Sequence, residues 1–179
     1  MFEDIKIGTS SPRTVNAIIE IPKDTYNKYE YDEKLGVIRL DRVLYSPMHY
    51  PVDYGFIPQT RSDDGDHLDV MVITNSPVFI GCLLEVRPLG VLLMEDAQGI
   101  DEKILAVPLK NPVYDHDKKL SDISPHFLKE IEHFFAEYKH LETCKDAVIK
   151  GWGDQLEAYR IIRESFETYQ SEIKDKMLK

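Results

Sequence analysis

The segment LLEVRPLGVLLMEDAQGIDEKILAVPL, residues 83–109, holds two apolar runs on either side of an acidic stretch. The runs 83–94 and 103–109 predict two strands, and the polar residues between them predict a hairpin tip. Further strand-like runs at 15–21, 37–40 and 68–74 are separated by Gly, Pro, Asn and Asp, and helical periodicity is absent up to about residue 115. Several short strands with frequent turns predict a small closed or partly open barrel.

Two helices are predicted from the apolar spacing of the remaining sequence. Ser124 followed by Pro125 is typical of a helix start, and Asp154 with Glu157 matches a capping box after an expected break at 151–153. The apolar stripes of the two helices are Phe127, Leu128, Ile131, Phe134, Phe135, Tyr138 and Leu141, and then Leu156, Tyr159, Ile162, Phe166 and Tyr169. We therefore expect a mainly β fold with flanking α, as one domain over residues 1–179, without internal repeats.

The composition is that of a globular protein, with 42% hydrophobic and 30% charged residues. No apolar run approaches the roughly 20 residues of a membrane span, and the first residues form no signal-peptide core. The 32 acidic and 22 basic residues give a net charge of −10, which disfavours nucleic-acid binding because that needs a basic surface. We expect a cytoplasmic protein with no membrane or nucleic-acid partner, whose Cys82 and Cys144 are reduced thiols.

Four carboxylates stand in front of an apolar run in the segment RSDDGDHLDVMVIT, residues 61–74. A polar turn accounts for one or two of them, but Asp63, Asp64, Asp66 and Asp69 repel one another unless a cation lies between them. Mg²⁺ is suited to several carboxylate oxygens. An EF-hand is excluded, because a loop starting at Asp64 has aspartate at its sixth position and Asn75 at its twelfth.

A second acidic group occupies the predicted hairpin tip, with Glu95, Asp96, Asp101 and Glu102 followed by Lys103. Alone, it is typical of a solvated loop. Two acidic groups at one barrel mouth, however, would suit metals about 4 Å apart, the arrangement of two-metal phosphoryl chemistry. Basic and phenolic residues that suit a phosphate accompany these groups in the sequence: Lys28, Arg42, Tyr50, Tyr54, Tyr138 and Lys139.

These segments resemble the family I soluble inorganic pyrophosphatases. The resemblance runs from about residue 15 to residue 142 and is found in IEIP (19–22), KYE (28–30), DR (41–42), YPVDYGFIP (50–58), DGDHLDV (64–70), EDAQGIDEK (95–103), AVP (106–108) and HFFAEYKHLE (133–142). It implies an OB-fold-like five-stranded barrel, Mg²⁺-dependent hydrolysis of pyrophosphate with several ions per subunit, and a homohexamer.

The resemblance also implies residue roles. Asp66 corresponds to the general base, with Tyr54 supporting the nucleophile network. The metal ligands would be Asp64, Asp69, Asp101, Asp96 and, through water, Glu30. The phosphate-binding residues would be Lys28, Arg42, Lys103, Tyr138 and Lys139. Glu20 matches an acid at the rim of the active site, and Tyr50, in the YPVDYGFIP segment, is expected as a further active-site residue.

Two departures from the family pattern are visible. His67 replaces the usual proline after DGD, so we expect a less rigid turn with an imidazole near the site, and Ala97 replaces an acid, which would weaken one outer metal site. The six site carboxylates and four cations sum to −2, and three or four Mg²⁺ would bring this to about +4 to +6, enough to attract a polyanion.

Two alternatives to this activity remain at this stage. One is a nucleoside triphosphate pyrophosphohydrolase, although the sequence has no glycine-rich nucleotide loop. The other is a non-catalytic OB-type binding module, although a groove for single-stranded nucleic acid should be basic and aromatic.

Overall fold

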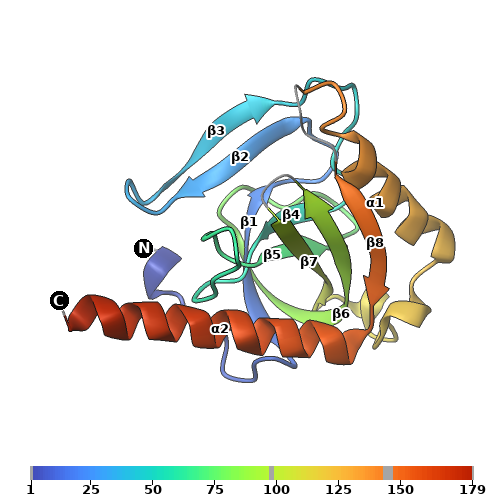
Figure 1. Cartoon of the computed structure of the whole chain (residues 1–179). Coiled ribbons are helices and arrows are strands. Elements are labelled where there is room, and N and C mark those ends of the chain that lie inside the picture. The colour runs from blue at the N-terminus through green and yellow to red at the C-terminus, as the bar shows by residue number, and fades with distance from the viewer. Residues whose placement is uncertain (1, 97–98, 143–146, 179) are drawn as a thin grey trace.

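Five strands close into a barrel in this computed structural model, which describes residues 2–96, 99–142 and 147–178 (Figure 1). They pair in the order β1 (Val15–Ile21), β4 (Asp53–Phe56), β5 (Asp69–Val72), β7 (Gly99–Pro108) and β6 (Leu83–Asp96). Pairing of β1 with β6 closes the ring, and only the β5–β7 pair within it is parallel. The predicted OB-like five-stranded barrel is confirmed.

A sixth strand, β8 (Val148–Gly153), adds to the free edge of β6. The break expected between the two helices at 151–153 is present, since α1 ends at Glu137 and α2 begins at Gln155, but the strand there was not predicted. The two glycines there suppress a strand prediction from local preference, but the backbone pairs with β6 regardless. Trp152 donates its indole N–H to Glu132, which ties this edge strand to the first long helix.

A separate hairpin stands over one end of the barrel and consists of β2 (Asn27–Asp32) and β3 (Val37–Val43) (Figure 1). The strand predicted at 37–40 is confirmed and extends to Val43. The strand β2 was not predicted, because its sequence NKYEYD is mostly polar. All six of its residues are half-buried, so the hairpin has one side toward the body of the protein.

Two long helices, α1 (Pro125–Glu137) and α2 (Gln155–Met177), flank the barrel, with short 3-10 helices at Phe2–Asp4, Pro112–Tyr114 and Leu120–Asp122. Asp154 caps α2 by accepting the N–H of Glu157 at 3.0 Å. The side chains of the predicted apolar stripes are buried or half-buried in both helices except at two leucines. Leu141 lies beyond the end of α1 and is 61% exposed, and Leu156 is 72% exposed because α2 buries its Ala158, Ile161 and Ile162 face instead.

The buried side chains form two clusters, one containing α1 residues and the other α2 residues. Along β5, Met71 belongs to the α1 cluster, whereas Val70 and Val72 belong to the α2 cluster. Side chains two residues apart on a strand share a face. Asp69 therefore lies on the same face of β5 as Met71, and Lys103 lies on the same face of β7 as Leu105. Both side chains consequently lie on the side of the barrel that packs against α1.

The strands β1 and β4 approach each other closely at Gly55. A Cβ built on this glycine would lie 1.9 Å from the carbonyl oxygen of Ile18, so no other residue fits without moving the backbone. None of the described helices is long and apolar enough to cross a membrane. Cys82 is a free thiol, and Cys144 lies outside the described residues.

Candidate active site

A cavity of about 570 Å³ lies between the barrel end, the β2–β3 hairpin and the residues that follow α1. Twelve of the predicted site residues line it: Glu20, Lys28, Glu30, Arg42, Tyr54, Asp64, Asp66, Asp69, Asp101, Lys103, Tyr138 and Lys139. The described lining includes eight carboxyl groups and four lysine or arginine cations, a formal charge of −4. The fold thus gathers residues from widely separated parts of the sequence into one acidic cavity.

Two predicted residues are not among the described residues that line the cavity. Tyr50 is 1% exposed and packs behind the cavity, with its ring centroid 4.7 Å from that of Phe134 and 5.6 Å from that of Tyr54. Burial raises the pKa of its phenol well above the usual value. The side chain of Asp96, like the whole of Ala97, lies outside the described residues.

Lys103 joins the two acidic segments at the floor of the cavity. Its ammonium is 2.7 Å from both Asp69 and Asp101 and 2.9 Å from the hydroxyl of Tyr54, which in turn donates to Asp69. Burial alone would lower the pKa of Lys103, but the two carboxylates outweigh it and raise this pKa far above the usual range. Lys103 therefore stays charged and holds Asp69 and Asp101 together.

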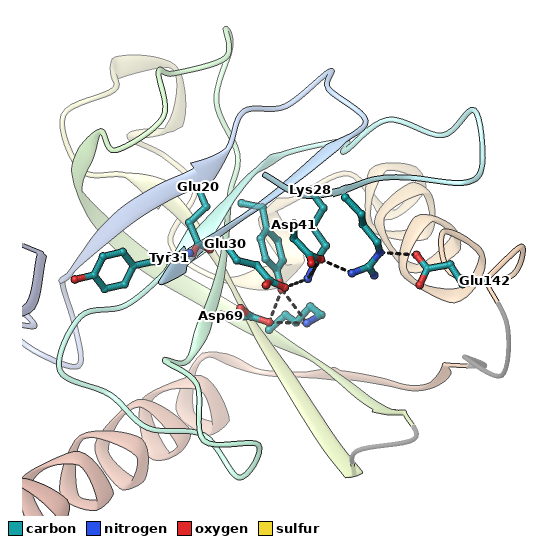
Figure 2. A network of polar contacts seen from close by, with 10 residues as sticks. Glu20, Lys28, Glu30, Tyr31, Asp41, Asp69 and Glu142 are labelled. Carbon is teal, nitrogen blue, oxygen red and sulfur yellow. Dashed lines mark hydrogen bonds and ion pairs between the residues drawn. The ribbon is translucent and has the colours of Figure 1, made fainter. Parts of the chain in front are cut away.

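The β2–β3 hairpin contributes a second charged group to the lining of the cavity (Figure 2). Lys28 pairs with Glu30 and lies 3.5 Å from Asp41. Arg42 pairs with the same Asp41 and donates from Nε to Glu142 at 2.8 Å, beyond the end of α1. The guanidinium is thus oriented from two sides, with its pKa raised by these carboxylates against the opposing effect of burial.

The Asp64–Asp66 turn is fixed by its own hydrogen bonds. Asp64 accepts the N–H of Asp66 at 3.0 Å, and Ser62 donates to the carbonyl of Asp66 at 2.8 Å. Gly65 has φ +90°, a conformation that glycine adopts readily. Burial, and then the nearby Asp64 and Asp69, raise the pKa of the Asp66 carboxyl.

Glu20 is a buried carboxyl at the back of the cavity (Figure 2). It is 8% exposed and accepts the backbone N–H of Tyr31 at 2.6 Å. Burial raises its pKa to about 8, and the hydrogen bond from Tyr31 only partly opposes this effect. Glu20 is consequently neutral over much of the physiological range in the metal-free protein.

No three acidic, histidine or cysteine side chains converge at metal-ligand spacing within the described part of the chain. The carboxylates instead contact cations, as in the pairs of Lys103 with Asp69 and of Lys28 with Glu30. The chemistry of the donors nevertheless fits Mg²⁺, because carboxyl oxygens line the cavity and because burial and neighbouring carboxylates raise the pKa of Asp66.

Four residues with a structural part in the site were not singled out from the sequence. Asp41 and Glu142 orient Arg42, and both stood within segments of the family resemblance. Glu33 and Arg61 form an ion pair beside the Asp64–Asp66 turn. Glu142 lies 100 residues from Arg42, and Glu172 lies 111 residues from Arg61, so no local pattern could have revealed these two pairs.

The five-stranded barrel and the acidic cavity at its end can be compared with those of known proteins. The structure resembles a crystal structure of inorganic pyrophosphatase from Thermus thermophilus, with a TM-score of 0.92 and 40% identity over 94% of this chain and 98% of that chain. A structure of inorganic pyrophosphatase from Coxiella burnetii gives a TM-score of 0.89 at 43% identity, covering 92% and 99% of the two chains.

Sequence comparison agrees with the fold. The family model described as inorganic pyrophosphatase matches residues 17–170. The inorganic pyrophosphatase of Methanosarcina mazei is 49% identical over 152 residues, covering 85% of this chain and 89% of that protein. That of a Nostoc species is 49% identical over 158 residues, covering 88% and 93%. The chain belongs to the inorganic pyrophosphatase family, whose members depend in general on metal ions.

Proposed function

We propose that this chain hydrolyses inorganic pyrophosphate to two orthophosphates with several Mg²⁺ ions and with Asp66 as the general base. The observation that supports this most strongly is the single cavity lined by twelve of the residues that the family resemblance implies. Asp64, Asp69 and Asp101 would bind the ions next to the attacking water, Glu30 would act on an ion through water, and Asp96 would add a ligand from the hairpin.

The charges of the cavity explain why metal would be needed. With a formal charge of −4, the described lining repels a polyanion. Bound Mg²⁺ would reverse this charge and lower the pKa of coordinated water toward neutrality. Asp66 would accept the proton of the attacking water, and the backbone hydrogen bonds of its turn keep the carboxyl facing the cavity.

The cationic side chains would bind the two phosphates. Arg42, oriented by Asp41 and Glu142, presents a planar fork that suits phosphate oxygens. Lys28, Lys139 and Tyr138 would contact further oxygens, while Lys103 balances Asp69 and Asp101. Tyr54 would orient the nucleophile through Asp69, to which its hydroxyl donates, and Glu20 and Tyr50 would support the site from behind.

Phosphate release from pyrophosphate and from ATP, each with Mg²⁺ and then with chelator, tests this function. We expect release from pyrophosphate only, abolished by chelator. Release of pyrophosphate from ATP, followed by phosphorus NMR in the same reactions, would favour a nucleoside triphosphate pyrophosphohydrolase, because such an enzyme yields pyrophosphate and a nucleoside monophosphate. No release from either compound would favour an OB-type binding module. We further propose a cytoplasmic enzyme with a single domain over residues 1–179, assembled as a homohexamer.

A further inference from the structure

Arg61 is a buried cation whose partners lie on three different elements. It is 8% exposed. Its Nη1 donates to Glu33 at 2.9 Å, in the turn between β2 and β3, and to the carbonyl of Gly65 at 2.6 Å, and its Nε donates to Glu172 of α2 at 3.1 Å. In Figure 1 the segment before β5 lies between the hairpin and α2, where these bonds join all three.

His67 adds a second connection between the same parts. Its ring stacks on Phe56, with centroids 4.9 Å apart and planes at 11°, and Phe56 stacks on Tyr31 of β2 at 5.4 Å and 14°. The ring nitrogens lie 2.8 Å from the carbonyl oxygen of Thr60 and 3.1 Å from Glu33. His67 is therefore held on three sides, so the turn is not left loose by the absence of proline.

These contacts enclose the two carboxylates of the turn. Asp64 and Asp66 lie between the fixed points Arg61, Gly65 and His67, while Glu30 immediately precedes Tyr31 in β2. Fixing Glu33 and Tyr31 to the turn consequently fixes the separation between Glu30 and the turn carboxylates. Without these contacts, repulsion between the carboxylates of Glu30, Asp64 and Asp66 would push the hairpin and the turn apart unless a cation lay between them.

We propose that Arg61, Glu33, His67 and Glu172, here called the Arg61 clamp, are positioning residues that hold the Asp64–Asp66 turn and the β2–β3 hairpin at the separation required for Mg²⁺ binding. The choice of ion rests on the proposed function. The clamp acts through the carboxylates rather than on substrate. Its loss should therefore weaken metal binding and leave turnover at saturating Mg²⁺ close to normal.

Calorimetric titration of the chelator-stripped protein with Mg²⁺, without substrate, tests the clamp. We expect Arg61→Met to bind Mg²⁺ roughly 10-fold more weakly, the scale on which residues supporting metal ligands act. The matched control is Arg160→Met, because Arg160 also pairs with two glutamates, but both of them, Glu157 and Glu164, lie on its own helix α2 and its side chain is 46% exposed. This control should bind as the wild type does.

If circular dichroism shows that Arg61→Met does not fold, a second variant provides the test. Glu33→Gln preserves the shape of the side chain and should also weaken Mg²⁺ binding. The loss of Mg²⁺ affinity in the double variant should be smaller than the sum of the two single losses, because both changes remove the same Arg61–Glu33 ion pair. Wild-type affinity in a folded Arg61→Met, or failing that in Glu33→Gln, would overturn the clamp. Wild-type protein that binds Mg²⁺ without releasing phosphate from pyrophosphate contradicts only the proposed function, whereas absence of Mg²⁺ binding contradicts both.

Discussion

At the scale of single residues, the site is organised by pairs of opposite charges that are mostly withdrawn from solvent. Lys103 is 2% exposed and lies between Asp69 from β5 and Asp101 from β7. Without this ammonium the two carboxylates would repel each other next to an apolar core. The lysine thus offsets the repulsion between these two carboxyl groups before any metal binds.

Replacing Asp69 tests its assignment as a metal ligand. Asp69→Asn removes a charged oxygen ligand while keeping the shape, so we expect phosphate release at ordinary Mg²⁺ to fall by roughly 100-fold. The matched control is Asp63→Asn, because Asp63 is exposed and does not line the cavity. Near-normal turnover in a folded Asp69→Asn variant would contradict the two-metal assignment.

Glu20 gives the metal-free protein a characteristic pH dependence. Its pKa is about 8 in the folded protein and near 4.5 when unfolded, so between these values the folded state holds a proton that the unfolded state lacks. Stability from this group is thus present below pH 4.5 and is lost as the pH rises toward 8, by about 1.4 kcal/mol per pH unit at most.

Urea unfolding with chelator present, from pH 5 to pH 8, measures this loss. We expect Glu20→Gln to show a shallower decline than the wild type, because the amide accepts the Tyr31 N–H without titrating. Superimposable pH profiles for the two proteins would show that Glu20 is not the group responsible.

Sequence patterns identify those residues of the site whose chemistry is concentrated locally. The carboxylates of DGDHLDV and the cations of KYE and LDR stood out in this way, and all the described ones line the cavity. Arg61 did not, because a single arginine among aspartates resembles ordinary surface charge. Its role depends on Glu172, which lies 111 residues further on.

At the scale of elements, barrel strands with continuous apolar runs were predictable, and strands formed by pairing alone were not. The run 83–94 corresponds to β6, Leu83–Asp96. The polar β2 and the glycine-containing β8 become strands only because β3 and β6 offer free edges to them. Local preference carries no information about such edges.

The contact between β1 and β4 should be intolerant of any side chain at position 55. Gly55→Ala would place a Cβ 1.9 Å from the Ile18 carbonyl, and we expect a loss of about 3 kcal/mol or more in the free energy of unfolding. Gly65→Ala is the comparison, since its Cβ meets no atom within 4 Å and only its φ of +90° opposes the change. We expect that variant to lose about 1–2 kcal/mol. Equal losses in urea titrations would contradict the close approach.

At the scale of the whole molecule, the barrel is a rigid support on which a hairpin, a turn and the segment after α1 assemble one acidic cavity. The net charge of −10 is consistent with a site that recruits cations before an anionic substrate. The homohexamer remains a prediction of the family resemblance. Sedimentation equilibrium should give about 125 kDa, six times the chain mass of 20.8 kDa, and a monomer mass would contradict it.

The dependence of pyrophosphate hydrolysis on Mg²⁺ concentration tests the account most directly. With several ions needed to reverse the charge of the cavity, phosphate release should be absent in chelator and should rise more steeply than the first power of free Mg²⁺ at low concentration. Release that persists in chelator, or that saturates as a single-site binding curve, would contradict the account.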